Sequence, residues 1–262
     1  MVSSIGKSVI DIFKQIAGVL SLFSNIIYWT VIGPFKGKSA HREGIFSQMV
    51  FVGIRSIVIV FFVTFFTGVV LAMQSAYQLE KMGATLYVSS LVAISLCREL
   101  SPVLTGLVVA GRAGSAIAAE LGTMKVSEQI EALDTMAINP VRFLAVPRFL
   151  ALFVMLPCLT ILGNLAGILG GFFIGTKSLN INPDLYMQTT FKHLATKDVY
   201  TGLVKALVFG VIIALISCYE GLNTKGGAEG VGKATTRSVV LSFILIILAD
   251  CLITAIFYFS KI

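Results

Sequence analysis

The stretch 56-SIVIVFFVTFFTGVVLAMQSAYQL-79 contains no charged side chain. The hydrocarbon core of a bilayer is about 30 Å thick, and an α-helix of about 20 apolar residues crosses it. Phe149–Thr176 is a second run without charge, and three further apolar runs contain isolated charges: Leu86–Gly111, Val199–Tyr219 and Val239–Phe259. The sequence therefore predicts five transmembrane helices, at about 51–74, 86–111, 149–175, 199–219 and 238–259.

The composition agrees with an integral membrane protein. Of the 262 residues, 56% are hydrophobic and only 13% are charged. A soluble helical protein of this length would need more polar residues to cover its core. All four cysteines fall inside the predicted spans, where they act as small apolar residues, and the two histidines are isolated in the sequence. We therefore expect no metal site.

The distribution of Lys and Arg predicts the orientation in the membrane. With the N-terminus placed in the cytoplasm, 13 Lys and Arg residues flank the inner ends of the spans, 6 lie on the outer side, and Arg98 lies within the membrane. Inner loops carry the excess of basic residues in membrane proteins. We expect a cytoplasmic N-terminus and a C-terminus on the outer side. The net charge of +7 follows mostly from this topology and does not indicate nucleic-acid binding.

The N-terminal segment has a polar face and an apolar remainder. Polar or small residues recur at every third or fourth position, which is typical of one face of an amphipathic helix; they are Lys7, Ser8, Asp11, Lys14, Gln15, Gly18, Ser21 and Asn25. Such a helix lies in the membrane interface, with Trp29 at the depth of the headgroups. We expect residues 1–47 to form this helix and a linker, and residues 48–262 to form the five-span domain.

The segment 226-GGAEGVGKATT-236 imitates a nucleotide-binding loop. Gly227, Gly232 and Lys233 have the required spacing, but Ala234 stands where Ser or Thr would hold Mg²⁺. The segment also connects two membrane spans, whereas a phosphate-binding loop follows a β-strand. We interpret it as a flexible glycine-rich inner loop, and we expect ATP, where it is used, to bind another polypeptide.

Charged residues within the predicted spans are candidates for function. The sequence 95-SLCRELSP-102 places Arg98 and Glu99 in the middle of the second span, Lys205 lies in the outer part of the fourth, and Asp250 lies midway through the fifth. A charge at the bilayer centre costs about 2.5–3.5 kcal/mol, so each needs a partner or a polar cavity. Our hypothesis is that Arg98 and Asp250 face each other or a shared cavity, with Glu99 and Lys205 nearby. A structural ion pair without a substrate role is the alternative.

The inner connection between the second and third spans predicts a short helix at about 124–138. In 123-TMKVSEQIEALDTMAINP-140, one apolar stripe forms at helical spacing, from Val126, Ile130, Leu133 and Ala137. Ser127 is placed to cap the start, and Asn139-Pro140 stops the helix. With Glu128, Glu131 and Asp134 turned outward, the helix is suited to a groove in a cytoplasmic partner. Contact with lipid headgroups is the alternative.

Two rows of small residues repeat at intervals of four. They are Gly106, Ala110, Gly114, Ala118 and Gly122 in the second span, and Gly163, Gly167, Gly171 and Gly175 in the third. Such rows let helices approach closely in lipid. Packing within one subunit and packing across a dimer seam both fit this pattern.

Two stretches closely resemble the signature of the MlaE/YrbE family. They are 98-RELSPVLTGLVVAGRAGSAIAAELGTMKVSEQIEALDTMAINPVRFLAVPRF-149 and 233-KATTRSVV-240. The resemblance runs from about Gln48 to the C-terminus. Members of this family are permease subunits of MCE-associated ABC transporters, which move phospholipid or sterol-like lipids across bacterial envelopes and into chloroplasts.

The resemblance implies a homodimer, one ATPase subunit beneath each protomer to bind ATP and Mg²⁺, an MCE-domain assembly on the outer side and, in many bacteria, a STAS-domain protein. The sequence is consistent with a Gram-negative inner membrane, in which the outer C-terminus would be periplasmic; another envelope or an organelle is the alternative. The resemblance also makes the helix at 124–138 the coupling helix, with Glu128, Ile130, Glu131, Leu133 and Asp134 at the ATPase. The residues that it implies for the lipid pocket are Arg98, Glu99 and Lys205. We add Asp250 as a charge within the fifth span, and Leu71, Gln74, Gln78 and Leu79 by depth and chemistry.

Two other functions remain as alternatives. One is a secondary transporter driven by protons or ions, with Glu99 and Asp250 as the carriers; five spans, however, do not divide into inverted repeats of equal size. The other is a scaffold that only anchors an ATPase. We expect no catalysis by the chain itself, since its sequence contains no paired nucleophile and base and no metal-ligand cluster.

Overall fold

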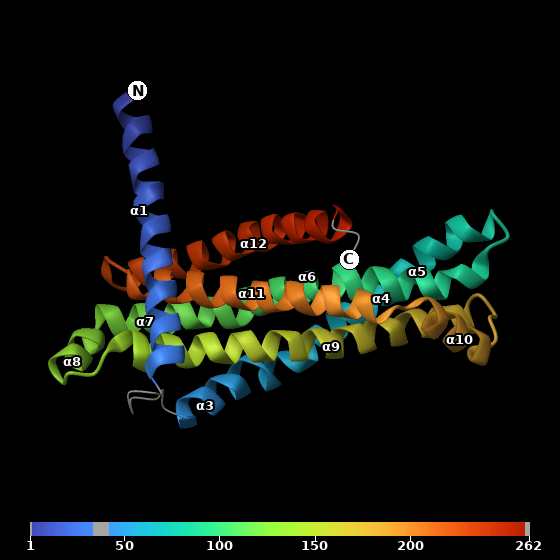
Figure 1. Ribbon diagram of the computed structural model, residues 1–262, viewed down its shortest axis with the longest axis horizontal. Coiled ribbons are helices and arrows are strands. Elements are labelled where there is room, and N and C mark those ends of the chain that lie inside the picture. The colour runs from blue at the N-terminus through green and yellow to red at the C-terminus, as the bar shows by residue number, and fades with distance from the viewer. Residues whose placement is uncertain (1, 34–41, 260–262) are drawn as a thin grey trace. The chain divides into compact units, whose positions relative to one another are not determined.

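The computed structural model describes residues 2–33 and 42–259, with side chains from Phe13 to Gly33 and from Glu43 to Phe259. Every regular element in these ranges is a helix (Figure 1). The all-α membrane fold predicted from the sequence is therefore confirmed. Most of the predicted linker, at 34–41, lies outside the described residues, as do the side chains of Lys7, Ser8 and Asp11 and the C-terminal residues 260–262.

The described elements include π-helical and 3-10 turns, written η, between longer α-helices. In chain order they are α1 (Val2–Ile27), η1 (Tyr28–Ile32), α3 (Arg42–Val52), η2 (Ile54–Ser56), α4 (Ile57–Glu80), η3 (Thr85–Tyr87), α5 (Val88–Ser95), η4 (Leu96–Leu100), α6 (Ser101–Val109), η5 (Ala110–Gly114), α7 (Ser115–Val126), α8 (Gln129–Thr135), η6 (Val141–Ala145), α9 (Val146–Lys177), α10 (Pro183–His193), α11 (Thr196–Leu222) and α12 (Gly227–Phe259).

Within the described residues, six helical segments are long and apolar enough to cross a membrane. They are Phe13–Ile32, Glu43–Glu80, Thr85–Val126, Val141–Lys177, Thr196–Leu222 and Gly227–Phe259. The last five contain the five predicted spans, and each extends beyond them. The first belongs to the N-terminal helix, whose length and composition also suit a crossing; its position in the interface stays a prediction.

The chain forms two compact units. Unit 1 comprises the described parts of Met1–Val50, Ala110–Leu152 and Val211–Ser242, and unit 2 comprises those of Phe51–Val109, Phe153–Gly210 and Phe243–Ile262. Each unit therefore combines segments that are distant in the sequence. The division into 1–47 and 48–262 stays a prediction.

In unit 2, helix α4 buries its small residues and exposes its large ones. Thr64, Gly68 and Ala72 are buried at intervals of four, whereas Phe62 and Phe66 are more than half exposed. A helix in a water-soluble protein would bury the phenylalanines instead. The pattern fits a helix whose outer face contacts lipid, because close packing of small residues then stabilises the contact between helices.

Helices α4 and α9 approach each other through glycines. A Cβ atom built on Gly68 would lie 2.0 Å from the carbonyl oxygen of Gly167, and one built on Gly170 would lie 2.2 Å from that of Phe65. Gly175 of the same row packs against the ring of Tyr186 in α10. The glycine row of the third span therefore packs within the chain, as one of the two interpretations predicts.

Helix α10 begins where the sequence supplies a helix cap. The side-chain oxygen of Asn182 accepts a hydrogen bond of 2.9 Å from the N–H of Asp184, and Pro183 occupies the first helical position. Tyr186 is 1% exposed. Burial raises the pKa of Tyr186 to about 12, so its phenol stays neutral and acts as a packing residue.

In unit 1, helix α1 packs on α11 and α12 through residues of its predicted polar face. Gln15 donates to Glu220 Oε1 at 2.8 Å and accepts from Arg237 Nη2 at 2.6 Å. A Cβ atom on Gly18 would lie 2.6 Å from the ring of Tyr219. These residues of the polar face therefore contact protein. The apolar residues turned outward are Phe13, Ile16 and Leu20.

The predicted glycine-rich inner loop is wrong for most of its length. Helix α12 begins at Gly227, so Gly232 and Lys233 lie in a helix, and Lys233 forms an ion pair of 2.6 Å with Glu229. The i, i+4 pairing of these side chains supports the helix. A segment in regular helical conformation does not form the cradle of backbone N–H groups that a nucleotide-binding loop provides.

We predict opposite effects for two glycine-to-alanine changes. Gly68→Ala should destabilise the protein by about 1–3 kcal/mol, because the new methyl group meets backbone. Gly232→Ala should stabilise it by about 0.5–1 kcal/mol, because alanine is the better helix former and no atom lies within 4 Å of its Cβ position. Thermal unfolding in one detergent measures both; equal unfolding temperatures would contradict the close approach of α4 and α9.

Candidate functional site

A π-helical turn positions Arg98 and Glu99. In η4 the N–H of Ser101 bonds to the carbonyl oxygen of Leu96, five residues earlier. Pro102 follows, and a proline has no N–H to offer the carbonyl group four residues before it, here that of Arg98. The sequence RELSP therefore favours a local break in the α-helical pattern, and such π turns are frequent at functional sites.

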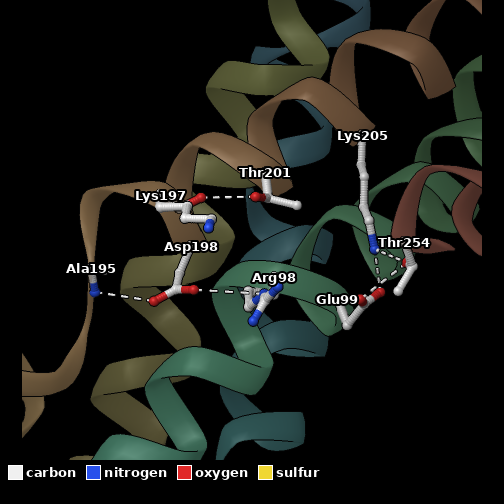
Figure 2. Close-up of polar contacts among 8 residues, drawn as sticks. All are labelled: Arg98, Glu99, Ala195, Lys197, Asp198, Thr201, Lys205 and Thr254. Atoms are coloured by element: carbon white, nitrogen blue, oxygen red, sulfur yellow. Dashed lines mark hydrogen bonds and ion pairs between the residues drawn. The ribbon is translucent and has the colours of Figure 1, made fainter. Parts of the chain in front are cut away.

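Lys205 of α11 brings three helical elements of unit 2 together. Its ammonium group is fully buried and contacts the Glu99 carboxylate, the Thr254 hydroxyl at 2.7 Å and Asp250 Oδ1 at 2.8 Å. Thr254 in turn donates to Glu99 Oε1 at 3.2 Å, which closes a small network (Figure 2). An ammonium group has three N–H donors, and here three oxygen atoms surround it. We call Glu99, Lys205, Asp250 and Thr254 the lysine cluster.

Arg98 has a different partner from the one predicted. Its Nε lies 3.6 Å from Asp198 Oδ1, while Asp198 Oδ2 accepts a hydrogen bond of 3.0 Å from the N–H of Ala195 (Figure 2). A direct pair of Arg98 with Asp250, one form of the hypothesis, is wrong, since Asp250 is paired with Lys205; a cavity shared by the two stays a prediction. The prediction that Glu99 and Lys205 lie near Asp250 is confirmed. The reason is rotational: Arg98 and Glu99 project from η4 in different directions. Arg98 therefore reaches Asp198 near the start of α11, whereas Glu99 reaches Lys205 farther along α11 and Thr254 of α12.

The exposed groups of the site carry opposite charges. The side chains of Arg98 and Glu99 are 40% and 39% exposed, whereas Asp250 is 21% and Asp198 is 11% exposed. The site contains two cations, Arg98 and Lys205, and three carboxylates, of Glu99, Asp198 and Asp250, so the formal charge of these five residues is −1. The groups that a bound molecule would meet first are therefore one guanidinium and one carboxylate, at adjacent positions of one helix.

A groove of about 600 Å³ lies along the second half of α4. All four residues that the sequence predicts for the lipid pocket by depth and chemistry line it: Leu71, Gln74, Gln78 and Leu79. The other lining residues are Met73, Ser75, Tyr77, Met82 and Leu91. Leu91 precedes Glu99 by eight residues, about 12 Å along a helix. The lining is mostly apolar, with two glutamine side chains that offer hydrogen bonds.

The predicted coupling helix is shorter than expected. The segment 124–126 belongs to the end of α7, and α8 spans only Gln129–Thr135. Glu128 between them has a φ of 59° and Ala137 after α8 a φ of 58°, and both left-handed residues interrupt the helical path. The predicted cap at Ser127 is wrong, because its hydroxyl donates back to the carbonyl oxygen of Thr123 at 2.8 Å.

Helix α8 exposes its acidic residues and turns one apolar residue inward. Ile130 is buried and Leu133 is half-buried, while Glu128, Glu131 and Asp134 are exposed. The rest of the predicted stripe does not form, since Val126 and Ala137 are exposed.

Lys125 at the end of α7 pairs with Glu131 and thereby joins α7 to α8. The hydrogen bond from Lys125 holds the pKa of Glu131 below its ordinary value. This surface therefore keeps its negative charge at neutral pH.

Sequence reasoning missed Asp198 and Thr254, although each has a signal. Asp198 precedes Lys205 by seven residues and Thr254 follows Asp250 by four. Residues at these spacings share a face of a helix. Within the described residues no group of three or more His, Cys, Asp or Glu side chains is arranged to hold a metal ion.

Comparisons with known proteins agree over nearly the whole chain. A family model described as "Permease MlaE" matches residues 45–256. A probable ABC transporter permease protein of Rickettsia prowazekii is 43% identical over 254 residues, which cover 97% of this chain and 96% of that protein. The intermembrane phospholipid transport system permease protein MlaE of Haemophilus influenzae is 34% identical over 258 residues, which cover 98% and 97%. The chloroplast protein TRIGALACTOSYLDIACYLGLYCEROL 1 of Arabidopsis thaliana is 35% identical over 228 residues, 87% of this chain and 65% of that protein.

We predict that Lys205→Met destabilises the protein far more than Arg98→Gln does. Removing the buried ammonium group leaves two carboxylates without their partner, which costs about 3–5 kcal/mol. The Arg98 pair is partly exposed and long, and its loss should cost less than about 1 kcal/mol. Thermal unfolding of both variants in one detergent tests this order. Equal losses of stability would show that the lysine cluster does not hold the three helical elements together.

Proposed function

This chain belongs to the MlaE permease family, and we propose that it is the membrane-spanning subunit of an ABC transporter that moves phospholipid or a related lipid. The groove on α4 carries this proposal. It is an apolar cavity on a membrane helix, it contains two amide side chains, and the residues that line it include every groove residue predicted from depth and chemistry. The names of the Haemophilus and Rickettsia relatives support the two parts of the proposal, phospholipid transport and ABC transport.

The groove suits acyl chains. Leu71, Leu79 and Leu91, with Met73 and Met82, offer apolar surface without a fixed shape, and methionine adapts to chains of variable geometry. Burying apolar surface contributes about 25 cal/mol per Å², so tail contacts supply most of the binding free energy. Gln74 and Gln78 would hydrogen-bond the ester or headgroup oxygens and so fix the orientation of the lipid.

The exposed charges suit a zwitterionic headgroup. The Arg98 guanidinium would meet the phosphate, since its planar donors match phosphate oxygens, and the Glu99 carboxylate would meet an ammonium group. Lys205 and Asp250 would hold Glu99 in position through the lysine cluster. This arrangement gives the four charged residues separate roles: two contact the headgroup and two position it.

The force for transport would come from a partner. We propose that α8 seats in a groove of a cytoplasmic ATPase, with Leu133 as the apolar contact and Glu128, Glu131 and Asp134 at the rim. The buried Ile130 would hold α8 on its own chain. ATP and Mg²⁺ would bind to that ATPase. The chain itself would perform no covalent chemistry.

The remaining assembly follows the family resemblance. We propose a homodimer in an inner membrane, with the N-terminus in the cytoplasm and the C-terminus in the periplasm. An MCE-domain protein would receive or deliver lipid on the outer side, and a STAS-domain protein would bind the ATPase.

The secondary transporter remains the competing function. In it, Glu99 and Asp250 would carry protons or ions. The observation that disfavours it is the shared contact of both carboxylates with Lys205, because a carboxylate held by a fixed cation is a poor carrier. A proton or ion gradient that drives lipid movement without ATP would establish this competing function.

We predict that Leu71→Trp, which fills the groove, lowers the amount of co-purified phospholipid. The loss should be roughly tenfold, which corresponds to about 1.4 kcal/mol of binding free energy. The matched control is Leu165→Trp, because Leu165 of α9 is 57% exposed and does not line the groove. Mass spectrometry of lipid bound to the intact transporter measures both. Equal lipid in Leu71→Trp, Leu165→Trp and the parent protein would refute the groove as the lipid site.

A further inference from the structure

Unit 1 contains a second buried cation, Arg148 of α9, which the proposed lipid site does not use. Its side chain is 4% exposed, and its Nη2 lies 2.8 Å from Glu120 Oε2 of α7. Its Nη1 donates to the carbonyl oxygen of Leu144 at 2.7 Å. Arg148 therefore bonds to its own helical segment and, through Glu120, to a different one.

The pair connects the two helices that flank α8. Glu120 lies six residues before the end of α7 at Val126, about 9 Å along the helix, and Arg148 lies seven residues after the start of η6 at Val141, about 10 Å. The two residues are thus at equal distances from the ends that lead to α8. The Glu120–Arg148 bond therefore ties together the two helices on either side of α8. We call the end of α7, α8 and the start of α9 the corner.

Other contacts of unit 1 make this corner stiff. A Cβ atom on Gly221 of α11 would lie 2.7 Å from the Cβ of Leu121, and one on Gly122 would lie 2.9 Å from the hydroxyl of Thr224. At the end of α7 that leads to α8, Lys125 forms an ion pair with Glu131 of α8. Helix α7 therefore has little freedom to slide on α11, and the Glu120–Arg148 pair links α7 to α9 at the same level.

We propose that Glu120 and Arg148 are positioning residues that transmit movement of α8 to the membrane helices. A push on α8 reaches α7 and α9 through two short connections that contain left-handed residues, Glu128 and Ala137. Without the pair, α7 and α9 shear past each other and absorb the push. With the pair, they move as one body. This inference rests on the proposed function, because it requires that an ATPase acts on α8.

The test separates coupling from folding. The parent transporter and the variant Glu120→Gln, each with its ATPase, are reconstituted in vesicles of phosphatidylethanolamine and phosphatidylglycerol, and fluorescent phospholipid moved and ATP hydrolysed are measured together. Glutamine keeps an oxygen that accepts a hydrogen bond from the buried Arg148, and residue 120 is half exposed to solvent, so the variant should still assemble. Lipid moved per ATP should fall roughly tenfold, while ATP hydrolysis changes less than about twofold. Exchange of the two charges, in Glu120→Arg with Arg148→Glu, should restore part of the ratio.

The matched control is Glu229→Gln. It neutralises a carboxylate of an exposed ion pair on α12, with Lys233 at 2.6 Å, and should leave lipid moved per ATP unchanged. An unchanged ratio in Glu120→Gln overturns the proposal, as does a parallel fall in transport and hydrolysis, which would make the pair purely structural. Should Glu120→Gln fail to assemble, Arg148→Lys, which keeps the charge but loses the second nitrogen of the guanidinium fork, gives the same ratio test. A parent transporter that moves no lipid with ATP would instead refute the proposed function.

Discussion

A fully buried ammonium group is the constraint on which unit 2 depends. Removing a charge from water costs several kcal/mol even after a protein relaxes around it, and only close oxygen atoms offset that cost. Lys205 therefore requires Glu99, Asp250 and Thr254 at contact distance. Because these residues come from η4 and α12, the need to satisfy one side chain fixes two further segments against α11. The same requirement orients Glu99 and leaves its neighbour Arg98 free to reach Asp198.

Lipid imposes a second constraint, which selects small residues at helix contacts. Outside water, burying a large apolar side chain between helices gains little over leaving it in the acyl chains, so contact between helices depends on close packing. Helix α4 follows this rule, with Gly68 against the backbone of Gly167 and Phe62 directed outward. The groove of the proposed lipid site lies farther along the same helix, where leucine, methionine and glutamine line it.

Long runs of uniformly apolar residues were predictable as membrane spans from the sequence alone. Five spans follow from charge-free runs such as Ser56–Leu79, because length and hydropathy alone determine whether a segment can cross a bilayer. Leu71, Gln74 and Gln78, which the sequence predicts for the lipid pocket, line one groove because they lie on one helix at a depth that follows from counting. Their role in lipid binding stays a prediction. Features that depend on backbone geometry or on a partner helix were not predictable. Glu128 occupies a left-handed conformation that no sequence rule assigns to a glutamate, and it shortens α8.

Pairing across helices shows the same limit. Four charges in three spans allow several pairings, and the choice depends on the rotation of each helix, which Pro102 alters through the π turn at η4. Counting residues gives the depth of Arg98 and Asp250 but not the direction in which they point. The helical spacing of Asp198 with Lys205, and of Thr254 with Asp250, carries the missing information, because polar residues on one buried face need partners on the segment that faces them. Asp198 and Lys205 both find partners on η4, and Thr254 and Asp250 both contact Lys205.

The two buried cations, Lys205 and Arg148, follow one physical rule: a buried charge needs a partner of opposite charge. Lys205 and Arg148 are each nearly inaccessible, and each pairs with a carboxylate from another helix. Lys205 is a compact cation that three oxygen atoms surround, so its cluster suits a fixed centre that holds a substrate-facing carboxylate. Arg148 has a planar guanidinium group, with Nη1 bonded to the carbonyl oxygen of Leu144 in its own helical segment and Nη2 bonded to Glu120 of α7. This geometry suits a rigid link between two helices. Because Glu120 is half exposed, this ion pair is accessible to water. An ion pair in contact with water forms and breaks at lower cost than one in lipid, so the link between α7 and α9 can be rigid and still reversible.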